Sequence, residues 1–534
     1  MSGSCLCTAR YGWGVTTTSA SVRLLGASVG GVGVAFGFAP FESFFAVVLG
    51  LAALIASIRG ATARRGALLG AVFGAVFLTI LVSWLHVLGI GVLAALVLVS
   101  VPFYAAFGAV FATVSGTRAW VLWGACLWVG TEFLRSVVPF GGFAWGRLAF
   151  TTVGTPLDSY ARWLGVAALS GVVFVLGGCL VLVLARASSA PVRVAGLVGA
   201  AVVVAAALLL PTGVADPGRN LQVAIVQGNV PGTGANGGWE QRQVLDNHVA
   251  TTIAYAQQVS TGATPQPDVV LWPENASDID PLTDTSAGSD ISAAAQAVGA
   301  PILVGAILDG PTAATAQNVG IAWDPRDGAG DRYVKRHLVP FGEYVPFRSV
   351  VTKVLPYVGR EIPRDMLAGD SPGAVPIAGT VLGDMMCFDV VFDPLARDVV
   401  RGGAQLLVVQ TNNATYTGTS QPEQQWQIAR MRAIEAGRQI AVPSTNGISA
   451  IADADGDVVA RAQSGVAQVL TEQITTGHGI TWGIRAGGYL EYALTAVGVI
   501  ALLAAVRRRH RKVPIPLDHA AQPAPSTGRA TASA

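Results

Sequence analysis

Charged residues are scarce in this sequence. Asp, Glu, Lys and Arg make up only 12% of its 534 residues, whereas 52% are hydrophobic. In a soluble protein roughly a quarter of the residues are charged, so this composition excludes an ordinary soluble globule. The formal net charge is only +2, which supplies no basic groove and argues against nucleic acid as a partner. We therefore expect a membrane protein with one large soluble insertion.

Cysteine and histidine are also few, and their spacing excludes the common metal sites. The five cysteines and six histidines form neither an HExxH motif nor paired CxxC motifs. Cys5 and Cys7 lie in the polar N-terminus, Cys126 and Cys179 lie in apolar runs, and Cys387 stands alone in the C-terminal half. We expect no disulfide framework, no metal site and no cofactor.

Apolar runs are the most prominent feature that is present. A helix needs about 20 apolar residues to cross a hydrocarbon core. Residues 1–21 contain no compact apolar region before a cleavage site, so no removable signal peptide is predicted. Eight spans are expected, near residues 22–39, 42–58, 66–88, 90–114, 118–135, 164–185, 192–211 and 488–506.

Basic residues predict the orientation of these spans, because Lys and Arg accumulate in cytoplasmic connections. If the spans alternate, one side carries Arg59, Arg64, Arg65, Arg118, Arg186, Arg193 and the basic run 507–512. The short connections on the other side hold only Arg135, Arg147 and Arg162. Both termini are therefore expected in the cytoplasm, and residues 212–487 outside it.

Residues 212–487 change in character to short β-rich runs that alternate with helical patterns. Predicted strands cover 221–230, 268–275, 301–308, 318–324, 379–386 and 404–413, predicted helices cover 241–259, 291–298 and 424–437, and residues 439–461 are expected to form two strands with a turn at 453–456. This pattern predicts an α/β domain with one substantial core.

The chain is thus expected to comprise five parts. These are a cytoplasmic N-terminus (1–21), a membrane domain of about seven spans (22–211), an extracytoplasmic α/β domain (212–487), a final span (488–506) and a disordered cytoplasmic tail (507–534) rich in Pro, Ala, Ser and Thr.

Three predicted strand ends carry reactive side chains. The apolar run 379–386 leads into Cys387, where a strand would fix a thiol and the following turn would expose it. Glu274 and Lys335 follow two other strands. A thiol, a carboxylate and an ammonium suffice for acyl transfer, as nucleophile, base and oxyanion ligand. Spacing alone leaves plainer alternatives open: a buried small side chain for Cys387, a helix cap for Glu274 and a solvated loop position for Lys335.

The segments WPEN (272–275), KRHLVPFGEYVP (335–346) and GDMMCFD (383–389) resemble the Glu, Lys and Cys motifs of the nitrilase, or carbon–nitrogen hydrolase, superfamily. The form of the second motif, with membrane spans on both sides, resembles the apolipoprotein N-acyltransferases. VQGNVP with Trp239 downstream, RMRAIEAGR, STNGISAIADADG, and Glu132 followed by PFGGFAW extend the resemblance over nearly the whole chain.

The resemblance implies an αββα sandwich and a two-step acyl transfer in the bacterial inner membrane. Glu274 would act as general base for Cys387, which attacks a phospholipid ester and forms a thioester. The α-amine of the S-diacylglyceryl cysteine of an apolipoprotein would then take the acyl chain, in the last step of lipoprotein maturation. Lys335 would stabilise both tetrahedral intermediates, and the enzyme would act as a monomer.

The resemblance also suggests supporting residues. Glu343 and Asp389 would assist the triad, residues 350–359 would form a lid that dips into the bilayer, and the substrate-binding residues would be Trp239, Phe341, Tyr344, Asn412 and Tyr416. A packed surface loop is the alternative for 350–359, and His337 is expected to be structural or pocket-lining. The chain departs from the family at Phe388 and Asp389, where Tyr-Glu is common, and at 413–416, which lacks the expected Asp and bulky aromatics.

Two further expectations concern the membrane half and the competing functions. Glu132 in a span is costly unless paired, and Arg135 on the same helical face is the expected partner near a lipid entrance. A membrane-tethered amidase with the same triad, an N-acyltransferase with another amine acceptor, and a degenerate non-enzymatic domain remain alternatives.

Overall fold

The computed structural model describes residues 19–185, 188–230 and 242–510. The predicted lid tryptophan Trp239, Arg186, most of the N-terminal segment 1–21 and residues 511–534 of the predicted tail lie outside the described residues.

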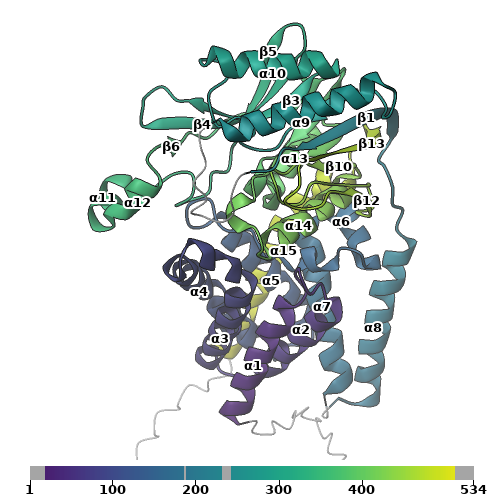
Figure 1. Ribbon diagram of the computed structural model, residues 1–534. Helices are drawn as coiled ribbons and strands as arrows, with labels where there is room; N and C mark the ends of the chain where they lie inside the picture. The colour runs from purple at the N-terminus through teal and green to yellow at the C-terminus, as the bar shows by residue number, and fades with distance from the viewer. Residues whose placement is uncertain (1–18, 186–187, 231–241, 511–534) are drawn as a thin grey trace, which may run out of the picture.

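The first half of the chain is a helical bundle to which the last helix returns (Figure 1). Its elements are α1 Ala20–Ala35, α2 Phe44–Ile58, α3 Ala63–Leu81, η1 Ser83–Leu88, α4 Ile90–Val114, α5 Trp120–Val137, η2 Leu148–Thr152, η3 Pro156–Asp158, α6 Ser159–Leu164, α7 Val166–Leu184, α8 Ala190–Leu209 and α15 Trp482–His510. Within the described residues, α3, α4, α7, α8 and α15 are long and apolar enough to cross a membrane, and α1 and α2 are shorter apolar helices. A helix lies at each of the eight predicted spans, although α15 starts before residue 488 and continues to His510.

The remaining residues form an α/β domain. Its strands are β1 Pro217–Gln227, β2 Val269–Leu271, β3 Ile302–Asp309, β4 Thr315–Asp324, β5 Gly328–Val334, β6 Asp365–Met366, β7 Ala374–Ile377, β8 Thr380–Asp384, β9 Leu406–Val408, β10 Ile440–Val442, β11 Ala450–Ala452, β12 Val458–Arg461 and β13 Gln468–Gly477. Its helices are α9 Gln243–Ser260, α10 Thr285–Val298, α11 Arg348–Val354, α12 Pro356–Glu361, η4 Cys387–Val391, α13 Asp393–Arg401, η5 Ala414–Tyr416 and α14 Gln421–Ala436.

Two sheets stack face to face in this domain. One has the order β13-β1-β2-β3-β4-β5, with β6 beside β4, and the other has the order β12-β11-β10-β9-β8-β7. Apolar side chains of both sheets, such as Ile225 and Leu382, fill the space between them. Helices α9 and α10 cover the outer face of the first sheet, and α13 and α14 cover that of the second (Figure 1). The αββα arrangement is the nitrilase-like sandwich expected from the sequence.

Residues 439–461 form three strands, so the prediction of two strands there is wrong. Pro443 follows β10 and has no N–H to donate, which ends that strand. The hydroxyl of Ser449 accepts from Ser444 N and that of Ser444 accepts from Gly447 N, so these two side chains hold a turn before β11. The sequence also gave no signal for the long strand β13, which pairs antiparallel with β1.

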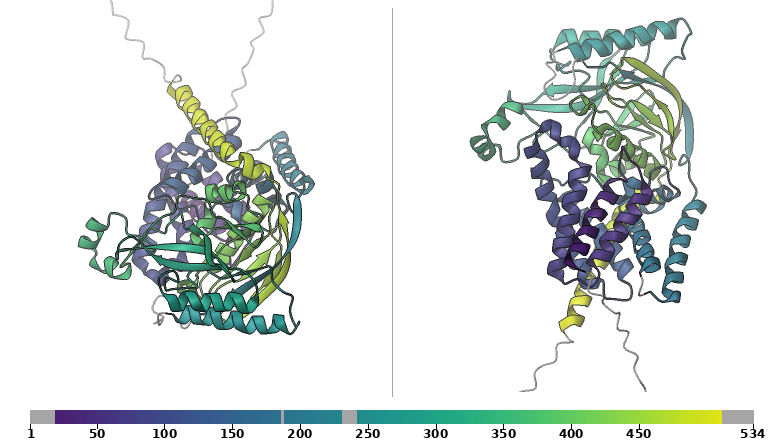
Figure 2. Two further views of the ribbon diagram at one scale, coloured as in Figure 1. Left: turned by 90° about the horizontal axis from the view of Figure 1, so that it is seen from above. Right: turned by 60° about the horizontal axis from the view of Figure 1, so that its bottom comes forward.

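The two halves share one continuous core. Helix α14 lies between the second sheet and the bundle (Figures 1 and 2), and nearly all of its side chains are buried although many are polar. Buried ion pairs continue across this boundary. Arg147 of the bundle pairs with Asp393 of α13 at 3.4 Å and with Glu491 of α15 at 3.0 Å.

The predicted ion pair between Glu132 and Arg135 is wrong: none joins them among the residues that the structure describes. Glu132 Oε1 instead accepts from Trp128 Nε1 at 2.8 Å and from Leu148 N at 2.9 Å. Arg135 donates to the carbonyls of Phe143 and Trp145. Because the segment after α5 folds back over these side chains, its backbone groups take the place of the expected ion pair, although Glu132 Oε2 and Arg135 Nε and Nη2 have no hydrogen-bond partner among the described residues.

Helices α11 and α12 form an arm that projects from the α/β domain (Figure 2). Several of its exposed side chains are apolar, with exposed fractions of 43% to 72% for Phe347, Val350, Val354, Leu355 and Tyr357. Exposed apolar surface of this kind marks a site of contact with lipid or with another molecule. The arm contains the predicted lid, residues 350–359.

Candidate active site

Cys387 lies at a sharp turn that follows strand β8. Its φ of 48° lies in the left-handed region that side-chain-bearing residues rarely adopt. The strained backbone is held by the N–H of Cys387, which donates to the carbonyl of Gln410 at 2.8 Å. The thiol is only partly buried. A strained turn that exposes a thiol at the end of a buried strand is suited to a nucleophile.

Lys335 is buried between two carboxylates. Its Nζ lies 2.9 Å from Glu274 Oε1 and 2.9 Å from Glu343 Oε1. Although burial alone would lower the pKa of Lys335, these carboxylates raise it well above its usual value. Lys335 therefore remains an ammonium ion, with its charge fixed in a water-poor site where electrostatic stabilisation is strong.

Two asparagines orient Glu274. Asn318 Nδ2 donates to Glu274 Oε1 at 2.7 Å and to Glu343 Oε1 at 3.2 Å. The backbone N–H of Asn412 donates to Glu274 Oε2 at 3.0 Å. Sequence reasoning missed Asn318, because a single Asn within a strand carries no signal that its side chain faces a distant Glu. It predicted substrate contact for Asn412, whose backbone N–H also holds the carboxylate.

The thiol belongs to the same electrostatic cluster. Burial, together with the negative charge of Glu274, raises the pKa of Cys387 to about 12, against the opposing effects of Lys335 and Thr411. At neutral pH only about one thiol in 10⁵ would be ionised. The nucleophile therefore needs a base during the reaction, and Glu274 is the carboxylate that acts most strongly on it.

Asp389 holds the turn that carries Cys387. Its Oδ2 accepts from the Tyr333 hydroxyl at 2.7 Å and from Met386 N at 3.2 Å, while its Oδ1 accepts from His337 N at 3.0 Å. Burial raises the pKa of Asp389 to about 6, although Lys335 and these hydrogen bonds act against burial. Since both oxygens are bonded, the shorter Asp at this position has a complete set of partners.

Asp384, just before the nucleophile, is a buried acid that the sequence did not reveal as part of the site. Both of its oxygens, and Oε1 of Gln410, have no hydrogen-bond partner among the described residues. Asp384 Oδ2 and Gln410 Oε1 face the same point beside Gly320. Burial, with the negative charges of Asp389 and Glu274, raises the pKa of Asp384 well above its usual value. A protonated Asp384 would donate from Oδ2 to Gln410 Oε1 and so give each of these two oxygens a partner.

Aromatic side chains from both halves surround the nucleophile. Tyr416 packs edge-on against Trp84 of η1 with ring centres 5.2 Å apart. Phe388, next to Cys387, stacks on Trp145 at 6.3 Å and on Phe143 at 6.1 Å. The wall on this side of the site is therefore built by the bundle, which is apolar enough to accept an acyl chain.

The other predicted residues lie around a second opening. Tyr344 and His337 line a cavity of about 410 Å³ beneath the arm, together with Phe140 and Arg336. Phe341 is exposed and has a φ of 59°. The triad, Glu343, Asp389, Asn412 and Tyr416 are thus brought together, whereas Phe341 and Tyr344 lie further out.

Gln424 of α14 connects the aromatic wall to the α/β domain. Its Oε1 accepts from the indole N–H groups of Trp84 at 3.1 Å and Trp145 at 2.7 Å. Its Nε2 donates to the carbonyls of Ala39 at 3.2 Å and Leu81 at 3.0 Å. One buried amide thus fixes three segments of the bundle beside the nucleophile.

A Gln424→Leu variant is expected to lose about 2–5 kcal/mol of stability, because two indole donors and two carbonyls lose their partner. Its melting temperature in detergent should fall. Glu423→Ala is the matched control on the same helix, since Glu423 only pairs with Arg461 at the surface and such pairs contribute little. Equal melting temperatures for Gln424→Leu and the unaltered protein would contradict this role.

Comparison with known proteins gives consistent matches over both halves. Residues 30–179 match the apolipoprotein N-acyltransferase N-terminal domain, and residues 222–482 match the carbon-nitrogen hydrolase family. The chain is 35% identical over 530 residues to the apolipoprotein N-acyltransferase of Mycolicibacterium smegmatis, covering 95% of this chain and 88% of the relative. It is 30% identical over 519 residues to that of Methylococcus capsulatus, covering 91% and 97%. Among solved structures, an amidase from Nesterenkonia sp. superimposes with a TM-score of 0.37 at 18% identity, covering 51% of this chain and 95% of the amidase.

Proposed function

Because the chain belongs to the apolipoprotein N-acyltransferase family, we propose that Cys387, Glu274 and Lys335 are the catalytic residues of this acyltransferase. The observation that carries the proposal is the buried Lys335, which lies 2.9 Å from both Glu274 and Glu343 and whose positive charge acts on the adjacent thiol. Nucleophile, base and oxyanion ligand thus share one electrostatic cluster.

In the first step, Cys387 Sγ attacks an ester carbonyl of a phospholipid while Glu274 takes the thiol proton. Lys335 stabilises the negative charge that develops on the carbonyl oxygen. The C–O bond to glycerol then breaks, and Glu274 returns the proton to the leaving oxygen. The products are a lysophospholipid and an acyl thioester on Cys387.

In the second step, the neutral α-amine of a diacylglyceryl cysteine attacks the thioester carbonyl. Glu274 takes a proton from the amine and returns it to the sulfur as the C–S bond breaks. An amide forms and the free thiol is restored. Glu343 keeps Lys335 in place through both steps, because Glu343 Oε1 accepts a hydrogen bond from the ammonium at 2.9 Å.

We assign supporting roles to the remaining predicted residues. Asp389 holds the nucleophile turn, and Asn412 orients Glu274 through its backbone. Trp239, Phe341, Tyr344, Asn412 and Tyr416 contact the lipid substrates, and residues 350–359 of the arm enter the outer leaflet as a lid. The apolar surface of the arm supports this placement.

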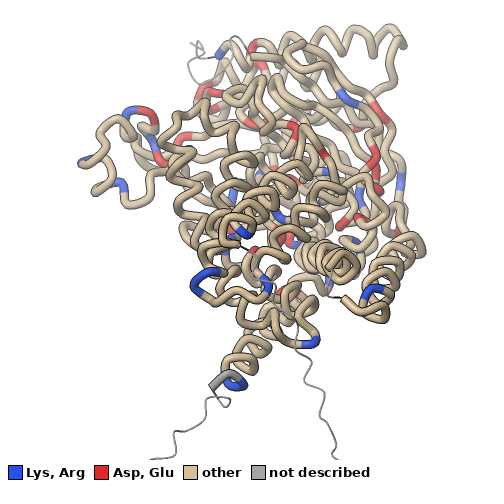
Figure 3. The backbone as a smooth tube through the Cα atoms, turned by 90° about the horizontal axis from the view of Figure 1, so that it is seen from below, with Lys and Arg blue, Asp and Glu red and all other residues tan. Residues whose placement is uncertain are grey.

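We propose eight membrane spans (seven within 22–211, the eighth at 488–506) with both termini in the cytoplasm, residues 212–487 outside, and a monomeric enzyme. Figure 3 looks at the end of the bundle away from the α/β domain, and the charged residues near the helix ends there are mainly Lys and Arg. The described N- and C-terminal helices also leave the bundle at that end (Figures 1 and 2). Because basic residues prefer the cytoplasmic side, this end of the bundle is the cytoplasmic one in the proposed topology, and both terminal helices leave from it.

The test is intact mass spectrometry of the purified protein after incubation with phospholipid in detergent, with and without a diacylglyceryl-cysteine peptide. We expect a long-chain acyl adduct on Cys387 that disappears as the peptide gains the same mass. Hydrolysis of small amides without any acyl adduct would contradict the proposal and favour a membrane-tethered amidase. An adduct that transfers only to another amine would show a different acceptor.

The pH dependence of adduct formation should be weak between about pH 7 and 9. With the pKa of the thiol at about 12, a reaction through free thiolate would accelerate about tenfold per pH unit over this range. General-base catalysis by an ionised Glu274 removes that dependence, because the proton leaves the sulfur during the attack. Stopped-flow measurement of single-turnover acylation distinguishes the two, and a tenfold rise per unit would exclude Glu274 as the base.

A further inference from the structure

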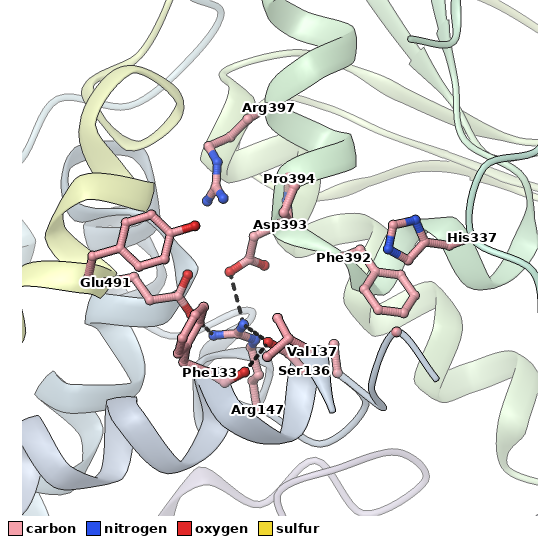
Figure 4. A pocket seen from close by; sticks show the side chains of 13 residues that line it. Phe133, Ser136, Val137, Arg147, His337, Phe392, Asp393, Pro394, Arg397 and Glu491 are labelled. Carbon is pink, nitrogen blue, oxygen red and sulfur yellow. Dashed lines mark hydrogen bonds and ion pairs between the residues drawn. The ribbon is translucent and has the colours of Figure 1, made fainter. Parts of the chain in front are cut away.

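A second cavity, of about 200 Å³, lies where the two halves meet, apart from the catalytic cluster. Its walls come from the end of α5, the segment that follows it, α13 and α15 (Figure 4). The polar groups that line it include Arg147, Asp393, Arg397 and Glu491. None of these residues takes part in the mechanism described above.

Arg397 is the unusual member of this group. Its side chain is only 7% exposed, and within the described part of the chain it makes no hydrogen bond or ion pair. Figure 4 shows its guanidinium extending from α13 into the space between α13 and α15. Gly488 of α15 leaves room for it, because a Cβ there would lie 3.2 Å from Arg397 Cζ. Arg397 attracts Asp393 and Glu491 electrostatically but hydrogen-bonds neither, so its guanidinium can still bind an anionic ligand in the cavity.

The neighbouring arginines already have partners. Arg147 pairs with Asp393 and Glu491, and Arg432 pairs with Asp393 and Glu435 at 2.7 Å each. Arg147, Arg432 and Arg397 carry three positive charges. They balance the three negative charges of Asp393, Glu435 and Glu491, so the cluster has no excess charge. A dianion would add two negative charges beside Asp393 and Glu491. A monoanion, such as a phosphodiester, suits one free guanidinium better.

The surroundings of the cavity favour an amphiphilic ligand. Val137 at the end of α5 and Tyr492 of α15 line it and are 44% and 56% exposed. Phe133 packs edge-on against Tyr492, with ring centres 5.3 Å apart. A ligand that placed its charge at Arg397 could therefore lay an apolar chain along these exposed side chains.

Only aromatic side chains separate the cavity from the nucleophile. Phe392 lines it and packs against Phe388, the residue after Cys387, with ring centres 5.1 Å apart. His337 lines both this cavity and the one beneath the arm, and its Nδ1 has no partner among the described residues. A head group held here would thus lie one layer of aromatic side chains away from the reacting sulfur.

We propose that this cavity binds the phosphodiester head group of a phospholipid, with Arg397 as its main ligand. The inference rests on the proposed function, because it places the acyl donor of the first step. The bidentate geometry of a guanidinium matches two phosphate oxygens, and the apolar rim follows the acyl chains.

The test distinguishes an effect on binding of the phospholipid head group from an effect on acylation of Cys387 itself. Single-turnover acylation of Cys387 is measured in Arg397→Gln and Arg397→Lys proteins with two donors: a phospholipid, and a p-nitrophenyl acyl ester, which has no phosphate. We expect the phospholipid concentration for half-maximal rate to rise about 10- to 100-fold in Arg397→Gln, with partial recovery in Arg397→Lys. The rate with the p-nitrophenyl ester should be unchanged, which also shows that the variant is folded.

Each other outcome overturns the assignment. Equal losses with both donors would mean that Arg397 only supports the fold, and no change with phospholipid would mean that it binds no head group. Inorganic phosphate that competes as well as lipid would identify a site for free phosphate. Arg326→Gln, at an exposed turn, controls for the loss of one positive charge. If the unaltered protein forms no adduct with phospholipid, the proposed function itself fails, which is a separate result.

Discussion

A Cys387→Ala variant is expected to form no acyl adduct and to lose acyl transfer by at least about 10⁴-fold. The thiol is the only group in the described site that can carry the acyl chain between donor and acceptor. Without it the amine would have to attack a phospholipid ester directly, and an alkoxide is a much poorer leaving group than a thiolate. Intact mass after incubation with phospholipid, followed by addition of the acceptor peptide, measures both half-reactions.

Cys387→Ser provides the control for folding and for chemistry. Serine can adopt the same backbone conformation with a φ of 48° and should leave the fold unchanged. It is expected to acylate slowly and to transfer poorly, because an oxygen ester resists amines more than a thioester does. Acyl transfer at an unchanged rate in Cys387→Ala would exclude the thioester mechanism.

A Lys335→Met variant should lower the rate of both half-reactions by about 10³-fold. Methionine keeps the length of the side chain but removes the charge that would stabilise the oxyanion. It also leaves Glu274 and Glu343, each 2.9 Å from the ammonium in the native site, as two uncompensated carboxylates. The pKa of Cys387 should rise further, since Lys335 is the main group that lowers it.

Single-turnover rates for acylation and transfer, measured separately, test this prediction. Because the oxyanion forms in both steps, the two rates should fall by similar factors. A loss confined to one step would restrict Lys335 to that step, and normal rates in both would exclude it from catalysis. Lys335→Arg retains the charge in a bulkier group and should recover part of the rate.

The residues proposed to be catalytic could be named from the sequence because strand-end motifs preserve them as local patterns. Glu274, Lys335 and Cys387 follow β2, β5 and β8, and Asp389 lies within one turn of the nucleophile. Glu343 and Asp389, which hold the triad, were also predicted, but other groups that hold the site could not be. Asn318 and Gln424 reach the site through contacts with residues far away in the chain, and a single polar residue carries no sign of such a contact.

The prediction for Glu132 and Arg135 failed for the same physical reason. Their spacing on one helical turn is correct for an ion pair, but local spacing says nothing about a loop that returns over the helix. The carbonyls of Phe143 and Trp145 compete for the guanidinium, and Leu148 N competes for the carboxylate. A periodic pattern predicted the helix correctly, and tertiary contacts decided which groups its charges meet.

The burial of α14 between the second sheet and the bundle bears on biosynthesis. Its polar side chains are satisfied by atoms of both halves, for example Gln424 by Trp84 and Arg432 by Asp393. The bundle helices α1 to α8 are synthesised first, so the α/β domain matures against a surface that is already inserted. Glu491 of α15 is synthesised last, and its ion pair with Arg147 forms only then. The two halves should therefore melt in a single cooperative transition, and the α/β domain expressed alone should aggregate through the exposed face of α14.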